Sequence, residues 1–189
     1  MKELAEPMHF GATGLRLLDS QLQNEQEMAA EEGINFSCVV TSPAAFLVKT
    51  GVIQQFHLQQ MVGDLVRNAI RAVRLVEGRD KRILLVMGER PEGYQIRICD
   101  TGLPFPPEIL RDFGRRGLTT GGSGHGLADL REIMAGCAGS ITVTEYGEEE
   151  SSYSKAISLV MDGRGMLRVH SALSGVDYER PLLEPAGSR

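Results

Sequence analysis

The sequence predicts an α+β domain, a two-layer sandwich in which helices cover one face of a mixed, mostly antiparallel β-sheet. Helix-like and strand-like segments alternate along the first half of the chain, a hairpin signal lies in the middle, and three strand-like segments close the pattern. With 189 residues, of which 42% are hydrophobic, the chain can bury one core of this kind.

The expected helices show apolar side chains spaced three or four residues apart. The first carries leucines on one face and ends at a glycine, and the second is the longest apolar-periodic stretch of the chain. We expect these helices over residues 14–32, 55–76, 107–113 and 126–137.

The expected strands are short runs rich in β-branched residues and bounded by turn-forming residues. Strands are expected over residues 35–41, 82–88, 94–99, 140–145, 154–161 and 167–171. The Arg90-Pro91-Glu92-Gly93 turn predicts a hairpin between the second and third of them. Residues 42–53 are expected to be irregular, and the tail after Gly175 to be loose.

This pattern divides the chain into an arm with the first helix (residues 1–33), one main domain (34–173) and a flexible C-terminal tail (174–189). No internal repeat interrupts it. The main domain holds every segment that the sequence suggests for ligand binding.

Composition excludes several classes of protein. The formal net charge of −5 argues against a general nucleic-acid binder. No apolar run approaches the roughly 18 residues that a membrane helix needs, and the N-terminus lacks a signal-peptide pattern. The cysteines Cys38, Cys99 and Cys137 are odd in number and lie in apolar contexts, so we expect buried thiols and a cytoplasmic setting.

The long second helix carries a candidate ligand-binding face. Asp64 and Asn68 are four residues apart and Arg71 is three further on, so helical geometry places them together. An amide oxygen suits Mg²⁺, a cation can meet a phosphate, and an acid can assist the metal shell or orient a water. The alternative is a solvated face, because polar residues also recur along this helix at Gln60, Asp64, Arg67, Arg71 and Arg74.

A second candidate segment is Asp100-Thr101-Gly102, at the end of a buried strand. A carboxylate there can accept a hydrogen bond from the exocyclic amine of adenine, and the glycine lets a base lie against the backbone. The alternative is an ordinary turn in which the Asp100 side chain caps Gly102.

The third segment is a glycine-rich run, Gly121-Gly122-Ser123-Gly124-His125-Gly126-Leu127, that leads into the last expected helix. Its amides and the positive end of the helix form a cradle for phosphates. Arg115 and Arg116 with two threonines before it can close over phosphates as a mobile lid. His125 is a helix-start residue rather than a base. The phosphate-side residues assigned here are Thr119, Thr120, Gly122, Ser123, Gly124, His125, Gly126 and Leu127.

Together these segments resemble the GHKL superfamily, the ATP-binding fold of histidine kinases, gyrase B, Hsp90 and MutL. The long helix is similar to its N box, Asp100-Thr101-Gly102 to its G1 box, and residues 122–127 to its G2 box, while Phe113 takes the place of the F box. Tyr153-Ser154-Lys155 adds to a resemblance to sensor histidine kinase catalytic domains. The resemblance covers about residues 14–171 and implies a Bergerat fold with a mobile ATP lid.

The resemblance implies ATP and Mg²⁺ as cofactors and assigns roles by position. Asp64, Asn68 and Arg71 would be catalytic, with Asn68 and Asp64 at the metal and Arg71 at phosphate. Asp100 would bind the adenine amine with Gly102 beneath the ring. Ser154 would support the adenine through Asp100 or water.

The implied activity is transfer of the γ-phosphate of Mg-ATP to a histidine on a separate or missing dimerisation domain, with a response regulator downstream. Nucleic acid is not an expected partner, no membrane span is expected in the chain itself, and both homodimerisation and attachment to a membrane-tethered kinase are left open. Pro7 and Gly11 flank His9 and disfavour a helix that would present it as the acceptor.

Two alternatives stay open at this point. The acid at Asp64, where many histidine kinases have Asn, is compatible with an ATP hydrolase or a protein-serine kinase of the same superfamily. Pro104, in place of the second glycine of the G1 box, and the missing acceptor are compatible with a non-catalytic nucleotide-sensing module.

Overall fold

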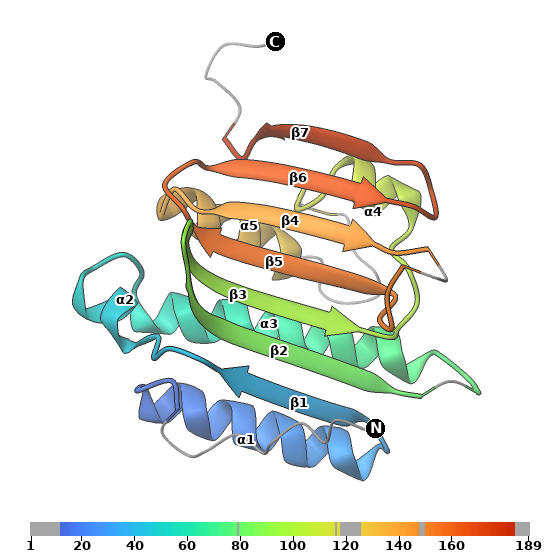
Figure 1. Cartoon of the computed structure of the whole chain (residues 1–189), viewed down its shortest axis with the longest axis horizontal. Coiled ribbons are helices and arrows are strands. Elements are labelled where there is room, and N and C mark those ends of the chain that lie inside the picture. The colour runs from blue at the N-terminus through green and yellow to red at the C-terminus, as the bar shows by residue number, and fades with distance from the viewer. Residues whose placement is uncertain (1–11, 79, 116, 118–125, 148–149, 184–189) are drawn as a thin grey trace.

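The computed structural model describes residues 12–78, 80–115, 117, 126–147 and 150–183. One layer is a seven-stranded sheet, and helices α3 and α5 lie behind it, as Figure 1 shows. The helices are α1 (Arg16–Glu31), α2 (Ala45–Lys49), α3 (Gln55–Arg74), α4 (Pro107–Arg111) and α5 (Gly126–Gly136). The strands are β1 (Asn35–Val40), β2 (Arg82–Arg90), β3 (Gly93–Asp100), β4 (Ser140–Glu145), β5 (Lys155–Met161), β6 (Met166–Ser171) and β7 (Asp177–Pro181).

The sheet has the strand order β1-β2-β3-β5-β4-β6-β7. The pairs β1·β2 and β4·β6 are parallel, and the other neighbouring pairs are antiparallel. The expected hairpin is present, with Arg90 opposite Gly93 at its turn. The mixed, mostly antiparallel two-layer architecture predicted from the sequence is therefore confirmed.

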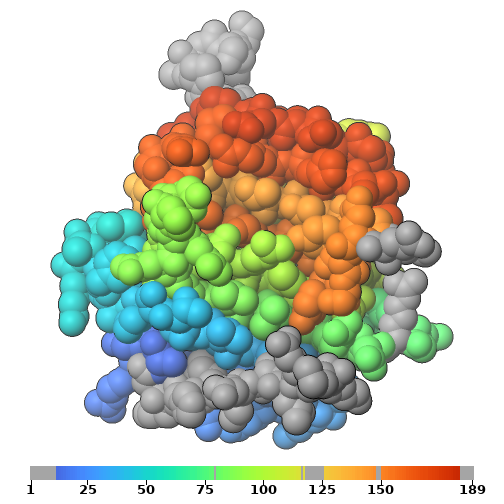
Figure 2. Space-filling view, in the orientation of Figure 1, coloured from blue at the N-terminus to red at the C-terminus, as the bar shows by residue number. Residues whose placement is uncertain are grey.

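Helix α3 supplies the centre of the core. Its buried side chains recur every three or four residues, so one face packs on the sheet while the other stays polar. Leu58, Met61 and Val62 are fully buried there, and Leu18 and Leu22 of α1 are equally buried. Within the described ranges, no comparable layer of helices covers the opposite face of the sheet, as Figure 1 shows. Strand residues form much of the surface that Figure 2 shows.

The segment after β1 and the C-terminal segment differ from the prediction. Residues 42–53, expected to be irregular, contain α2, whose Ala45 and Leu47 are buried. The tail after Gly175, expected to be loose, contains β7, which pairs with β6. The side chains of β7 are mostly polar, so its sequence carries no apolar signal. Its main-chain pairing and the hydrogen bond from Tyr178 Oη to Leu110 O (2.7 Å) hold it in place.

The thiols follow the expectation from composition only in part, because Cys137 is half-buried. Cys38, Cys99 and Cys137 are all free, and the first two are buried. Burial raises the pKa of the Cys38 thiol to about 12, so it is protonated at neutral pH. In the described part of the chain, no helix is both long and apolar enough to cross a bilayer.

Replacing Leu58 by alanine should lower the free energy of unfolding by about 2–5 kcal/mol, because a fully buried side chain leaves a cavity. Urea titration followed by circular dichroism measures this change. Leu17→Ala is the matched control, since Leu17 is 62% exposed, and its effect should stay within about 0.5 kcal/mol. Equal losses in the two variants would contradict the assigned packing of α3.

Candidate functional site

A cavity of about 340 Å³ lies between α3 and the segment that follows β3. Its walls are mainly apolar, and four polar or charged side chains reach it: Asn68, Arg71, Asp100 and Lys155. An apolar pocket with a few convergent polar groups is typical of a small-molecule site. The structure thus brings together three residues that the sequence analysis assigned to one ligand, and it adds Lys155.

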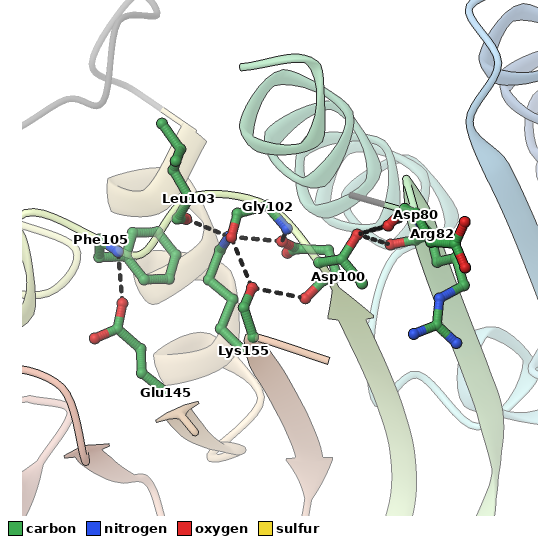
Figure 3. A network of polar contacts seen from close by, with 10 residues as sticks. Asp80, Arg82, Asp100, Gly102, Leu103, Phe105, Glu145 and Lys155 are labelled. Carbon is green, nitrogen blue, oxygen red and sulfur yellow. Dashed lines mark hydrogen bonds and ion pairs between the residues drawn. The ribbon is translucent and has the colours of Figure 1, made fainter. Parts of the chain in front are cut away.

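Asp100 ends β3 inside the sheet, where its side chain is only 6% exposed. Its Oδ1 accepts a hydrogen bond from the Gly102 amide at 2.8 Å, so the turn weighed as the alternative interpretation is indeed formed. The same oxygen lies 2.6 Å from Lys155 Nζ, as Figure 3 shows. Burial raises the pKa of the Asp100 carboxyl, and the neighbouring ammonium and amide oppose that rise.

Lys155 begins β5, directly opposite Asp100 in the strand register. Its side chain is 4% exposed. The ammonium also donates to Leu103 O at 2.6 Å and lies 5.5 Å from the centre of the Phe105 ring. These additional contacts stabilise the buried ammonium beyond its ion pair with Asp100. Removal of either partner of the pair would leave the other charge buried and uncompensated.

The turn after Asp100 approaches α3 very closely. A Cβ atom on Gly102 would lie 2.6 Å from both the carbonyl carbon and the Cβ of Ala72, so no other residue fits without a shift. The Leu103 amide donates to Ala72 O at 3.2 Å. The turn is therefore attached to the same helix that carries Asn68 and Arg71.

Ser154 and Thr101 fix the main chain of this turn. Ser154 Oγ donates to Asp100 O at 3.0 Å and to Gly102 O at 2.7 Å, so it contacts Asp100 through the carbonyl and not through the carboxylate. Thr101 Oγ1 donates to Asp80 O at 2.8 Å and accepts from the Arg82 amide at 3.0 Å. The hydrogen bonds of Ser154 and Thr101 thus hold the backbone that positions the Asp100 side chain.

Glu145 fixes the wall of the cavity from β4. It is 1% exposed and accepts hydrogen bonds from the Phe105 amide at 2.5 Å and from Ser171 Oγ at 2.6 Å. Phe105 lines the cavity and packs edge-on against Phe113, with ring centres 6.0 Å apart. Phe113, assigned to the F-box position, is thus fully buried behind the site.

Asp64 occupies a different position from the other α3 residues. The described lining of the cavity includes Asn68 and Arg71 but not Asp64. Its Oδ1 instead lies 2.6 Å from Arg67 Nη2, and Arg67 Nη1 lies 3.6 Å from Glu25. Gly126 packs against Asp64, since a Cβ there would lie 3.5 Å from Asp64 Cγ.

The phosphate side of the expected site lies largely outside the described residues. Thr119, Thr120, Gly122, Ser123, Gly124 and His125 fall there, as do His9 and Arg116. Gly126 and Leu127 are described, in α5, and Leu127 is buried. Among described residues, no group of three or more His, Cys, Asp and Glu side chains could hold a metal ion.

One protein-family model matches the part of the chain that contains the cavity. Residues 53–166 match the family described as "Histidine kinase-, DNA gyrase B-, and HSP90-like ATPase". The chain belongs to this ATPase family. The match contains α3, the Asp100 turn and Lys155, so the described lining of the cavity falls within the matched residues.

One curated relative of the chain is a probable sensor kinase. The chain is 28% identical over 121 residues to the probable C4-dicarboxylate sensor kinase of Bacillus subtilis (strain 168). The aligned region covers 59% of this chain and 23% of that protein. The chain thus spans about a quarter of the length of this curated relative.

Solved structures of histidine kinases share the fold. The nucleotide-free catalytic domain of histidine kinase ThkA has a TM-score of 0.55 at 19% identity, covering 75% of this chain and 91% of that one. Full-length ShkA in complex with AMPPNP has a TM-score of 0.55 at 15% identity, covering 92% of this chain and 42% of that one.

Sequence reasoning missed Lys155 and Glu145 as site residues. Lys155 was noted only as part of a motif, and its pairing with Asp100 depends on which strands are neighbours. A lysine at the start of an otherwise apolar strand is the one signal that could have revealed it, because lysine is rarely buried without a partner.

Gly102→Ala should lower the free energy of unfolding by roughly 1–3 kcal/mol, because the added methyl overlaps Ala72. Nucleotide affinity should fall with it. Gly136→Ala is the control, because no atom lies within 4 Å of its Cβ position in α5, and it should be neutral or slightly stabilising. Calorimetric titration and urea unfolding measure both effects; unchanged values for Gly102→Ala would refute the close approach.

Glu145→Ala should cost about 1–3 kcal/mol in the free energy of unfolding, because the buried Phe105 amide loses its acceptor. Glu145→Gln retains one carbonyl oxygen and should lose less. Thermal unfolding of the two variants side by side checks this order, and a reversed order would show that the carboxylate does not hold the Phe105 wall.

Proposed function

We propose that this chain is the ATP-binding catalytic domain of a histidine kinase in two-component signalling. It binds Mg-ATP beside α3 and transfers the γ-phosphate to a histidine on a separate dimerisation and phosphoacceptor domain, from which a response regulator receives it. The observation that carries the proposal is the convergence of Asn68, Arg71 and Asp100 on one apolar cavity within the ATPase-family match.

The cavity suits a purine nucleotide. Its apolar walls, which include Ile98, Leu103 and Ile157, can sandwich a flat base, and the Asp100 carboxylate at its polar end can meet the edge of that base. Gly102 keeps the backbone of the turn close to α3. The base would thus be held by β3, β5 and α3, all parts of the rigid sandwich.

Asn68 and Arg71 serve the phosphate end. Asn68 offers an amide oxygen to the cavity, which is a hard donor of the kind Mg²⁺ takes. Mg²⁺ keeps water and phosphate oxygens as its other ligands, so one side-chain donor is compatible with the absence of a three-residue cluster among described residues. When bound, the ion neutralises charge on the phosphates, and Arg71 adds a cation beside them.

Phosphotransfer needs little from the protein beyond position and charge. An imidazole nitrogen of the acceptor attacks the γ-phosphorus with its lone pair, and the bond from that phosphorus to the bridging oxygen breaks. The imidazole then releases its remaining N–H proton to solvent. ADP leaves with the electron pair on its β-phosphate. Arg71 stabilises the negative charge that shifts toward the leaving group.

The hydrolase and serine-kinase alternative depends on Asp64 as a base. Its carboxylate is paired with Arg67 at 2.6 Å and is absent from the described lining of the cavity. This placement favours phosphotransfer over activation of a water. The second candidate is a nucleotide-sensing module, which binds ATP without transferring its phosphate.

Asn68→Ala should reduce the rate of phosphotransfer roughly 100-fold or more, because the contribution of a metal ion is worth several kcal/mol. The assay uses γ-labelled ATP, this chain and purified dimerisation domains that carry candidate histidines. Mg²⁺ should strengthen ATP binding to the wild type, measured by calorimetry, and not to Asn68→Ala.

The matched control is Asn24→Ala, an exposed asparagine of α1, which should transfer phosphate at the wild-type rate. ATP binding without transfer to any acceptor domain would support the sensing module instead. Full activity of Asn68→Ala would refute the metal assignment.

A further inference from the structure

Lys155 gives the base-binding end of the cavity a hydrogen-bond donor that a lone carboxylate lacks. Asp100 and Lys155 face each other across β3 and β5, with Nζ 2.6 Å from Oδ1, and both side chains line the cavity. Figure 3 shows the ammonium between the carboxylate and the Leu103 carbonyl. The recognition group at this end is therefore an acid–ammonium pair.

The pair is expected to persist when a base enters. Both side chains are almost fully buried, and separation of a buried ion pair leaves an uncompensated charge. A neutral amine on a base returns only one hydrogen bond to the carboxylate, which is less than that loss. A base therefore meets Lys155 in place, rather than displacing it.

The ammonium has donors to offer. It carries three N–H groups, and described acceptors take two of them, Asp100 Oδ1 and Leu103 O. Because Lys155 is itself part of the cavity lining, an acceptor atom on a base can reach the ammonium.

Purine bases differ at this edge in the order of their donors and acceptors. Adenine presents a donor at the 6-amino group and an acceptor at N1, whereas a 6-oxopurine presents an acceptor at O6 and a donor at N1. A lone carboxylate accepts only, so it repels the 6-oxo group. An acid–ammonium pair satisfies either order.

From this complementarity we propose that Lys155 is a specificity-determining residue that lets the site take 6-oxopurine nucleoside triphosphates as well as ATP. This inference rests on the proposed function, since it concerns the base in the same cavity. It names Lys155 as the residue that broadens the choice of nucleotide.

The test compares Mg-ATP with Mg-ITP, two nucleotides that differ only at this edge of the base, by calorimetric titration of the full chain. The two dissociation constants of the wild type should agree within about threefold. Lys155→Met removes the donor at similar length, and it should favour ATP over ITP by about tenfold or more. Lys49→Met, an exposed lysine on α2, is the control and should keep the wild-type ratio.

The outcomes separate this inference from the proposed function. If the wild type binds ATP about tenfold or more tightly than ITP and Lys155→Met keeps that ratio, the inference is overturned while the nucleotide site stands. If neither nucleotide binds folded wild type or folded Lys155→Met, the proposed function fails with it. If Lys155→Met does not fold, the ratio of the wild-type dissociation constants for ATP and ITP is the test. A preference for ATP of about tenfold or more then overturns the inference.

Discussion

The buried ion pair between Asp100 and Lys155 is the interaction on which the candidate site depends. It joins the end of β3 to the start of β5, at the point where the chain leaves the sheet to form the wall of the cavity. Loss of one partner from such a pair typically costs about 3–5 kcal/mol, since the other charge stays buried. The pair thus fixes the carboxylate, the Leu103 carbonyl and the register of two central strands together.

Around this pair, the sandwich holds the cavity from several independent elements. Gly102 sits against Ala72 of α3, Ser154 holds two carbonyls of the turn, and Glu145 of β4 holds the Phe105 amide. Each of these contacts attaches the segment after β3 to a helix or strand of the sandwich, or to the residue directly before β5. The base end of the site is consequently part of the folded core. A ligand can therefore bind there without first ordering the surrounding protein.

Much of the fold could be predicted because its signals are local. The apolar period of α3, the hairpin turn before Gly93 and the position of Asp100 at a strand end all depend on neighbouring residues. Helical spacing places Asn68 and Arg71 on one face of α3, but it places Asp64 there as well, and Asp64 is absent from the described lining of the cavity. The assignment of the chain to the ATPase family rests on the same ordered motifs.

Non-local partners could not be predicted from the sequence. Lys155 contacts Asp100 only because β5 lies beside β3 in the sheet. The order of strands in a sheet cannot be predicted from the residues of any single strand. The same holds for β7, whose polar residues pair with β6. Asp64 is a different case, because its carboxylate pairs with Arg67, three residues further along the same helix, instead of reaching the cavity. For Lys155 and β7, a neighbour from a distant part of the sequence decides what an ambiguous residue does.

The charges that line the cavity have a consequence for how a ligand arrives. Among the described lining residues Arg71 and Lys155 stand against Asp100, so the cavity carries one positive charge in excess, on a chain of formal net charge −5. A polyanion is repelled by the whole molecule at long range and attracted near this opening. Its association rate should therefore respond to ionic strength in two opposing ways, with screening weakening the distant repulsion as well as the local attraction.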